Sequence, residues 1–284
     1  MHELLKALQD IQLRDLPWRH THDPYKILVS EIMLQQTQVD RVVPFYTRFI
    51  RQFPTPQKLA TAPLSKVLKA WQGLGYNRRA VYLQRSARIL SSATLLSKRS
   101  SDLPSRAALF GEASRARPFS QEAFASRLPG VGPYTAAAVE AFAYNKPTVF
   151  IETNVRTVFF YHCFPNKKHV SDKEILPLVE QALKKSKMEP REFYARLMDY
   201  GTMLKKQGVK LNSQSKHYSK QSKFEGSYRQ VRGQILRALL VEPATLNQLI
   251  KITGRKKSEL VKVVAGLSKE GMIELRRNKF CIAE

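Results

Sequence analysis

The sequence predicts a nearly all-α protein that ends in a small α+β unit. From Asp23 to about Tyr200, apolar residues recur three and four positions apart, which is the period of amphipathic helices. No earlier segment alternates apolar and polar residues as a strand does; this pattern begins only in the C-terminal string MIELRRNKFCIAE.

The individual helices can be followed along the chain. MHELLKALQDIQLRD predicts a short amphipathic helix and lacks the basic and apolar regions of a secretion signal. A long apolar stripe runs through KILVSEIMLQQTQVDRVVPFYTRFIRQF, with an expected break at Pro44. LSKVLKAWQGLG predicts a helix ended by its glycines, and RRAVYLQRSARILSS predicts another. Residues 94–120 are rich in Ser, Ala and Arg with weak periodicity, so we expect an irregular insertion there.

A second unit follows a basic segment. Residues 205–228 carry many more Lys and Arg than acids, which predicts either a solvated linker or a basic stretch that tracks a phosphate backbone. Residues 229–284 then predict three short helices, a strand, a turn at Arg277-Asn278 and a strand. This is the order of a winged helix. The third helix of that fold often enters the DNA major groove, but winged helices also bind protein partners.

Composition points to a polyanionic partner. The 284 residues include 48 Lys and Arg against 23 Asp and Glu, a net charge of +25. Such an excess favours nucleic acid, because phosphate contacts release condensed counterions, although charge alone does not choose DNA over RNA. No window approaches 18 uninterrupted apolar residues, so we expect no membrane span.

The cysteines and histidines indicate a reducing, intracellular setting. Cys163 and Cys281 are far apart and form no CxxC pattern, and the six histidines show no metal-binding spacing. This excludes a disulfide framework and predicts neither a zinc site nor an iron–sulfur cluster.

The most specific local motif is LPGVGPYTAAAVEAFAY, over residues 128–144. Gly130 and Gly132 predict a tight hairpin between two helices, since glycine adopts backbone angles closed to other residues. The N–H groups at the start of the second helix then favour an anion. We expect Gly130, Val131, Gly132 and Thr135 to bind a DNA phosphate; the alternative is an ordinary Gly-rich turn.

These strings resemble a known family. LPWR, SEIMLQQTQV, GLGY and LPGVGPYT occur in the order found in the endonuclease III superfamily of helix-hairpin-helix DNA glycosylases, and match its MutY-like adenine DNA glycosylases most closely. The resemblance covers about residues 14–205, and FEGSYRQVRGQIL (residues 224–236) is similar to a later segment of some MutY-like proteins. It implies one glycosylase domain over residues 1–204. Within this domain we expect a six-helix lobe over about residues 25–134 and a second lobe from residues 1–24 plus 135–204.

The resemblance implies a catalytic set of Glu31, Tyr134, Glu152 and Asn154. Glu31, in SEIMLQQ, corresponds to the acid that protonates the departing base. A carboxyl on an otherwise apolar helix is partly desolvated, which raises its pKa toward that role. The alternative is a structural acid that caps a helix or pairs with an arginine.

Glu152 departs from the family pattern, which typically has an aspartate in the string FIETNVRTVF. Three interpretations stay open. Glu152 stabilises the cationic sugar in an adjusted backbone, or the site serves a different base, or Glu152 only favours the N-terminus of the next helix, with Thr153 or Asn154 as its cap. The first is slightly favoured.

Tyr134 stands where bifunctional members carry a lysine, so no Schiff base and no strand cleavage are expected. By resemblance, Gln36, Leu74 and Tyr76 wedge into the hole left by the extruded base, although Leu74 and Tyr76 would also suit core packing. An unpaired amide would be costly in a core, which favours the wedge for Gln36. Arg19, in LPWR, corresponds to a residue beside the flipped base.

Two further departures concern cofactors and domains. Leu204 stands where the first of four cluster-binding cysteines would be, so we expect no iron–sulfur cluster; a monovalent cation at the hairpin stays open. The β-rich domain that recognises 8-oxoguanine is replaced by the expected winged helix.

The sequence therefore predicts a monomeric, monofunctional DNA glycosylase acting on double-stranded DNA. The first expected substrate is adenine opposite guanine or 8-oxoguanine. Alternatives are a glycosylase for uracil, thymine, hypoxanthine or an alkylated base, and an inactive lesion-binding protein.

Overall fold

The computed structural model describes residues 1–99, 128–216 and 223–284, which belong to two compact units. Among these residues, unit 1 holds residues 1–31 and 131–216, and unit 2 holds residues 32–99, 128–130 and 223–284. This division differs from the two predicted lobes. The N-terminal residues up to Glu31 cluster with unit 1, and the C-terminal residues cluster with unit 2.

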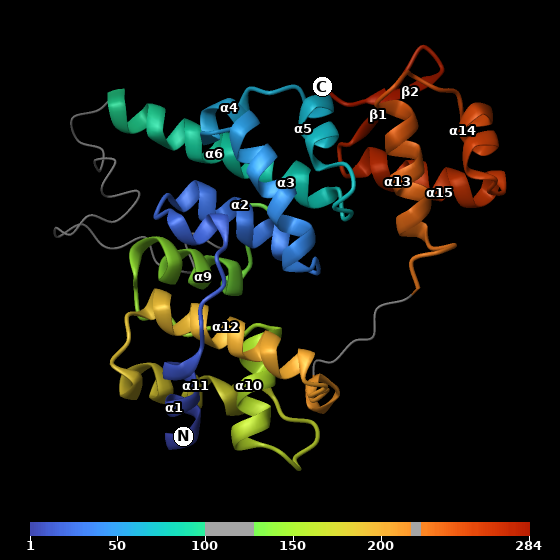
Figure 1. Ribbon diagram of the computed structural model, residues 1–284. Helices are drawn as coiled ribbons and strands as arrows, with labels where there is room; N and C mark the ends of the chain where they lie inside the picture. The colour runs from blue at the N-terminus through green and yellow to red at the C-terminus, as the bar shows by residue number, and fades with distance from the viewer. Residues whose placement is uncertain (100–127, 217–222) are drawn as a thin grey trace. The chain divides into compact units, whose positions relative to one another are not determined.

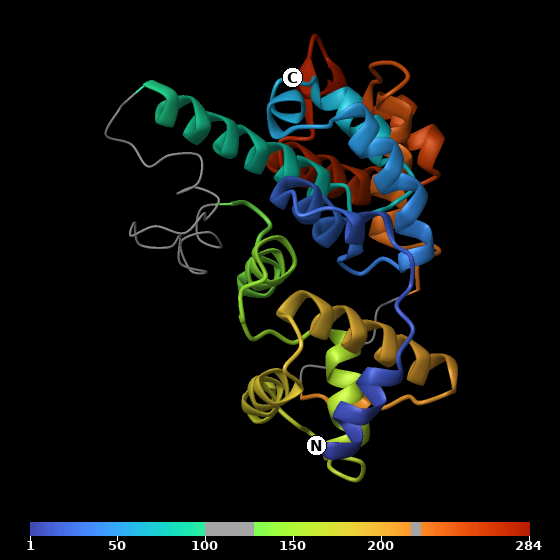
Figure 2. The ribbon, with the colours of Figure 1, turned by 60° about the vertical axis from the view of Figure 1, so that its left-hand side comes forward.

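Unit 1 is a helical bundle around one apolar core. Its helices are α1 (His2–Asp10), the 3-10 helix η1 (Pro17–His20), most of α2 (Pro24–Leu34), α9 (Pro133–Tyr144), α10 (Thr153–Cys163), α11 (Asp172–Ser186), α12 (Pro190–Lys206) and the 3-10 helix η2 (Asn212–Gln214). Both ribbon views show α1 beside α10 (Figures 1 and 2). Leu4 and Leu8 of α1 are fully buried in the same cluster as Phe159 of α10 and Leu197 of α12. The apolar period along each helix supplies this core.

The segment predicted as a basic linker begins as part of unit 1. α12 ends at Lys206, and the Val209 N–H donates to the Leu204 carbonyl at 3.0 Å. Ser215 then forms a parallel bridge with Val170. The interpretation as a solvated linker is therefore wrong for residues 209–215, whose backbone is anchored by these bonds; residues 217–222 lie outside the described residues.

Unit 2 begins with the end of α2 and a helical lobe. The helices of this lobe are α3 (Val39–Gln52), α4 (Pro56–Ala60), α5 (Leu64–Trp71) and α6 (Arg78–Arg99). The expected break at Pro44 is wrong, since Pro44 lies inside α3 and the chain turns instead at residues 35–38. Val42, Tyr46 and Phe49 are buried on one face across Pro44. Their packing outweighs the hydrogen bond that proline cannot make.

The expectation of an irregular insertion over residues 94–120 is wrong for its first six residues. Residues 94–99 continue α6, and residues 100–120 lie outside the described residues.

The C-terminal part of unit 2 is the predicted winged helix (Figure 1). It consists of α13 (Tyr228–Leu239), α14 (Leu246–Thr253), α15 (Lys257–Lys269) and the antiparallel strands β1 (Ile273–Arg276) and β2 (Lys279–Ile282). Arg277 and Asn278 have φ of 48° and 61°, the geometry of a tight hairpin turn, at the predicted position. Ala244 pairs with Phe280 and extends the sheet edge. Within the described ranges, no helix is both long and apolar enough to cross a membrane.

Candidate active site

Glu31 occupies a buried position on α2. Its helix neighbours Ile27, Leu28 and Ile32 are each about 1% exposed, and Glu31 itself is 4% exposed. Burial raises the pKa of Glu31 from 4.5 to about 7; a hydrogen bond from Tyr134 opposes this rise and the charge of Glu152 adds to it. Glu31 therefore carries a proton near neutral pH, as a general acid must.

Tyr134 reaches Glu31 from α9. Its hydroxyl donates to Glu31 Oε2 at 3.2 Å, across 103 positions of sequence. Burial raises the pKa of Tyr134 well above its usual value, and the charges of Glu31 and Glu152 raise it further. The phenol therefore stays neutral and keeps its proton for this hydrogen bond.

The hairpin before α9 has one conformationally demanding glycine. Gly130 has φ of 77°, and a Cβ there would lie 2.9 Å from the Tyr82 ring. Gly132, the N-cap of α9, has φ of −86°, which any residue adopts. The expectation that both glycines need special backbone angles is thus wrong for Gly132. Val131 and Thr135 are buried, and phosphate binding by this hairpin stays a prediction.

Glu152 is the N-cap of α10. One of its carboxylate oxygens accepts from the backbone N–H of Asn154 at 2.5 Å and of Val155 at 2.9 Å. The Asn154 side-chain amide donates to the other oxygen at 3.3 Å. The cap is therefore Glu152 itself, which corrects the expectation of Thr153 or Asn154.

Two residues of α12 that sequence reasoning missed hold Asn154 in place. A Cβ at Gly201 would lie 2.7 Å from Asn154 Cβ, so only glycine allows α10 and α12 to approach this closely. One turn later, Lys205 Nζ donates to Asn154 Oδ1 at 2.6 Å. A glycine inside the helical string DYGTML was the available signal, because helix interiors disfavour glycine.

The charges around Glu152 partly offset its burial. Burial raises the pKa of Glu152, while the Val155 N–H, the Lys205 ammonium, the Asn154 N–H and the Arg156 guanidinium lower it. Glu31 has one such opposing contact, from Tyr134. The arrangement thus combines a protonated acid at Glu31 with a carboxylate at Glu152 that is better supported as an anion.

Comparison with known proteins decides the family. Residues 29–185, more than half of the chain, match the family described as HhH-GPD superfamily base excision DNA repair protein. The chain belongs to the HhH-GPD superfamily. This confirms the resemblance noted in the hairpin and the α2 string.

Curated relatives of this HhH-GPD protein carry the name adenine DNA glycosylase. The one from Mycobacterium tuberculosis is 41% identical over 146 residues, which cover 51% of this chain and 41% of that protein. The human one is 36% identical over 162 residues, which cover 54% of this chain and 26% of that protein. The matched segment thus spans less than half the length of these two relatives.

A solved structure described as a thermostable thymine-DNA glycosylase has a similar fold. Its TM-score is 0.53 at 26% identity, covering 76% of this chain and 94% of that one. The helical architecture is therefore shared with a solved member of the glycosylases.

Arg19 of the HhH-GPD protein lies in η1 and pairs with Asp199 of α12. Its two terminal nitrogens donate to the two Asp199 oxygens at 2.7 and 2.9 Å. Although burial alone would raise it, the pKa of Asp199 is lowered by hydrogen bonds from Arg19 and Arg14. Among the hydrogen bonds of the described residues, none joins Arg19 to Glu31, Tyr134 or Glu152. Arg19 is thus engaged in an ion pair that ties the N-terminal segment to α12, and its place beside a base stays a prediction.

The predicted wedge residues all lie in unit 2. Gln36 is exposed and has φ of 56°. The argument that its amide would be costly in a core therefore does not apply, because Gln36 is not in the core. Tyr76 is half-buried with φ of 49°, and Leu74 is 3% exposed. Gln36 and Tyr76 stand at turns and are at least partly accessible to solvent, whereas Leu74 packs in the core. Their wedge role stays a prediction.

Arg79 of α6 was missed and holds both wedge turns. Its Nη1 donates to the carbonyls of Ile32, Met33 and Gln35 at 2.9, 2.8 and 2.5 Å, and its Nη2 donates to Thr37 Oγ1 at 3.1 Å and Gly75 O at 3.2 Å. These bonds satisfy the carbonyls that end α2. In sequence, Arg79 is one of two arginines that begin a helix, and this gave no sign of burial.

The cofactor prediction concerns Leu204 and the two cysteines. Leu204 is 3% exposed and belongs to the core of unit 1, and Cys163 and Cys281 are both free. In the part of the chain that the structure describes, no cluster of three His, Cys, Asp or Glu residues could hold a metal ion. Absence of the iron–sulfur cluster stays a prediction.

Proposed function

We propose that this protein is a monofunctional DNA glycosylase that removes adenine opposite guanine or 8-oxoguanine in double-stranded DNA. The observation that carries this proposal is the hydrogen bond between Tyr134 and the buried Glu31, with Glu152 close enough for its charge to act on both groups. The Tyr134 hydroxyl is hydrogen-bonded to Glu31, and the charge of Glu152 raises the pKa of both groups. The names of the curated relatives support adenine as the base.

The two carboxyl groups suit hydrolysis of an N-glycosidic bond. Glu31, protonated near neutral pH, gives its proton to a ring nitrogen of the base as the bond between C1′ and the base breaks. The electron pair of that bond leaves with the neutral base. The carboxylate of Glu152 stabilises the cationic sugar. Water then adds to C1′ and gives a proton to the Glu31 carboxylate, which restores the acid and leaves an abasic site.

The hydrogen-bonding group at position 134 supports the monofunctional assignment. A lyase of this type needs an amine that attacks C1′ and forms a Schiff base. Tyr134 carries a neutral phenol at that hairpin position and cannot form one. The expected product is therefore an intact strand with an abasic site.

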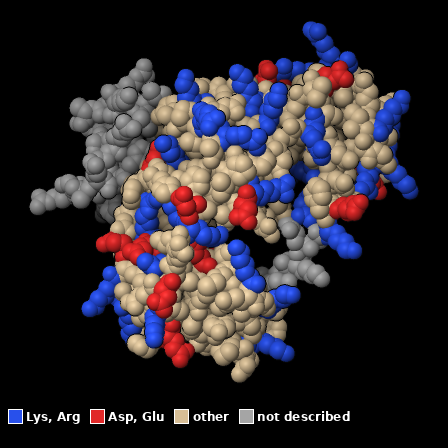
Figure 3. Space-filling view, viewed as in Figure 1, with Lys and Arg blue, Asp and Glu red and all other residues tan. Residues whose placement is uncertain are grey.

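Charge supports DNA as the partner. Figure 3 shows Lys and Arg side chains outnumbering acidic ones over the visible face, in line with the net charge of +25. Affinity for a polyanion should therefore fall steeply with salt. The hairpin adds N–H groups at the start of α9 for one phosphate.

Thymine opposite guanine is the second candidate substrate. The structural likeness to a thymine-DNA glycosylase favours it, as does Glu152 at the position where the family typically has an aspartate. We further propose that the protein is an intracellular monomer without an iron–sulfur cluster. Leu204, packed in the core of unit 1, supports the last point.

A single-turnover assay tests the proposal. Enzyme in excess is incubated with labelled duplexes that contain A:8-oxoG, A:G, T:G, U:G, hypoxanthine or an alkylated base, and strands are resolved with and without alkali. We expect alkali-dependent cleavage, fastest at A:8-oxoG or A:G. The Glu31→Gln protein should bind the same duplexes and release no base. Failure on every duplex would favour an inactive lesion-binding protein, and scission without alkali would contradict the monofunctional assignment.

A further inference from the structure

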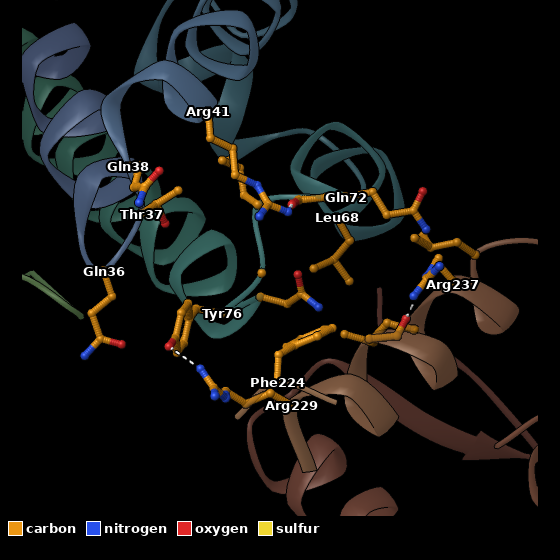
Figure 4. Close-up of a pocket in the computed structure, with 17 residues that line it drawn as sticks. Gln36, Thr37, Gln38, Arg41, Leu68, Gln72, Tyr76, Phe224, Arg229 and Arg237 are labelled. Carbon is orange, nitrogen blue, oxygen red and sulfur yellow. Dashed lines mark hydrogen bonds between the residues drawn. The ribbon is translucent and has the colours of Figure 1, made fainter. Parts of the chain in front are cut away.

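Unit 2 contains a groove of about 860 Å³ between two of its parts (Figure 4). One wall comes from the turns around residues 36–41 and 72–77 of the helical lobe. The other comes from α13 of the winged helix and from Phe224, which precedes it. This volume lies in the range of about 300–1,000 Å³ that is usual for sites binding small organic groups.

The charge of the groove has one sign. Arg41, Arg229 and Arg237 line it, and no aspartate or glutamate is among its lining residues. Arg237 is exposed, and its guanidinium Nε donates to the Gly233 carbonyl of its own helix at 3.4 Å. Among the described side chains, no carboxylate forms an ion pair with it, so this guanidinium can take a phosphate.

The groove also presents aromatic and amide groups. Phe224 is 60% exposed, although it lines the hollow. Arg229 Nη1 donates to the Tyr76 hydroxyl at 2.7 Å and thereby fixes the tyrosine ring on the opposite side (Figure 4). The amides of Gln36, Gln38, Gln72 and Asn77 add donors and acceptors. Aromatic faces with arginines and amides are the groups that bind an unstacked nucleotide.

Gly233 keeps the groove open. It lies inside α13, where glycine costs about 1 kcal/mol relative to alanine. A Cβ at Gly233 would have no atom within 4 Å, so helix packing does not demand a glycine there. The missing side chain instead leaves room in the groove, of which Gly233 is a lining residue.

We propose that this groove binds one unstacked nucleotide of a DNA strand, with its base against Phe224 and its phosphate on Arg237. The winged helix would thus bind DNA through α13, in addition to any contact by α15. The inference rests on the proposed function only in taking DNA as the partner. It adds a second nucleotide site that consists of unit 2 residues alone.

The test measures DNA binding by fluorescence anisotropy in the full-length Glu31→Gln protein, which should bind without releasing a base. The probes are a labelled single-stranded 20-mer and a labelled duplex with one unpaired central nucleotide. Gly233→Leu fills the groove with a better helix former, and Gly233→Ala is its matched control. Lys185→Ala, at an exposed position of α11 in unit 1, is the control for loss of a single positive charge outside the winged helix.

We expect Gly233→Leu and Phe224→Ala to weaken binding of both probes about 5-fold or more, the loss of one base stack, and Gly233→Ala to bind as the parent does. Arg237→Ala should lower the slope of log affinity against log salt on the single strand by about 0.7, the value of one phosphate contact. The proposal is overturned if Gly233→Leu binds like Gly233→Ala, or if Lys185→Ala loses as much affinity for the unpaired nucleotide as Phe224→Ala. The proposal is also overturned if the protein binds a poly-glutamate peptide more tightly than DNA and Gly233→Leu abolishes this binding. The groove would then be assigned to an acidic protein segment.

These outcomes are independent of the glycosylase assay. The groove test measures DNA binding by the Glu31→Gln protein and does not depend on base release. If the protein with Glu31 released no base, the proposed function would be refuted, but the result on the groove would still hold.

Discussion

Replacing Glu31 by glutamine should make the folded protein more stable, and more so as the pH rises. Burial raises the pKa of Glu31 from 4.5 to about 7, with opposition from the Tyr134 hydrogen bond and a further rise from Glu152. The folded state therefore binds this proton more tightly than the unfolded state. The stability that the protonated carboxyl contributes is complete below pH 4.5 and is lost as the pH rises toward 7.

The size of the effect follows from the shift. The rise in the pKa of Glu31 from 4.5 to about 7 corresponds to about 3.5 kcal/mol in the free energy of unfolding, at about 1.4 kcal/mol for each tenfold change in proton affinity. Most of this loss falls between pH 5 and pH 8. Glutamine does not titrate, so the advantage of Glu31→Gln over the wild type should grow by about 2 to 3 kcal/mol across that interval.

Urea unfolding followed by circular dichroism, at pH 5 and pH 8, measures this difference. Glu180→Gln is the control, because the Glu180 side chain is 50% exposed on α11, where it pairs with Lys184, and its replacement makes the same chemical change outside the buried site. An advantage of Glu31→Gln that stayed constant between pH 5 and pH 8, or that shrank, would refute the burial of a protonated Glu31. The assignment of Glu31 as general acid would then lose its physical basis.

Three further outcomes are expected. The single-turnover rate of base release should fall about tenfold per pH unit above pH 7, as Glu31 loses its proton, and a rate that stays flat to pH 9 would contradict this. Gly201→Ala should destabilise the protein by about 1–3 kcal/mol and slow base release, because the new Cβ would clash with Asn154. Gly233→Ala is the control and should have neither effect, since its Cβ would meet open space. Equal unfolding midpoints for the two variants would contradict the close packing of Gly201 against Asn154. Arg79→Met should lower the free energy of unfolding, measured in urea, by about 3 kcal/mol or more, because it leaves several carbonyls without a donor. A decrease below about 1 kcal/mol would show that water replaces the guanidinium as their donor.

The helical architecture could be predicted because local periodicity encodes it. The apolar stripes of α3, α5 and α6 and the strand–turn–strand string after α15 each required only neighbouring residues. Pro44 misled the prediction because its lost hydrogen bond is local, whereas the burial of Val42 and Tyr46 that outweighs it depends on other helices. The residues after Lys206 misled it for the same reason, since their polar composition conceals the bridge between Ser215 and Val170.

The site was only partly readable from the sequence. The motif strings brought Glu31, Tyr134 and Glu152 to attention, but the hydrogen bond that joins the first two spans 103 positions. Gly201 and Arg79 were missed because their partners come from other segments. An arginine near a helix start is usually solvated, and nothing in its neighbours showed that five acceptors converge on it.

The two carboxyl groups illustrate how one residue type can take opposite roles. Glu31 is embedded in an apolar helix and has one hydrogen-bond donor, the Tyr134 hydroxyl, to support its charge. Glu152 accepts hydrogen bonds from two backbone N–H groups and one side-chain amide. The positive charge of Lys205, which is hydrogen-bonded to Asn154, also lowers the pKa of Glu152. A single proton shared by such a pair resides on the less supported member, which is Glu31. Because the cap of α10 supplies donors that oppose the effect of burial on the pKa of Glu152, the same bonds that start the helix also favour the negative charge that a cationic sugar requires.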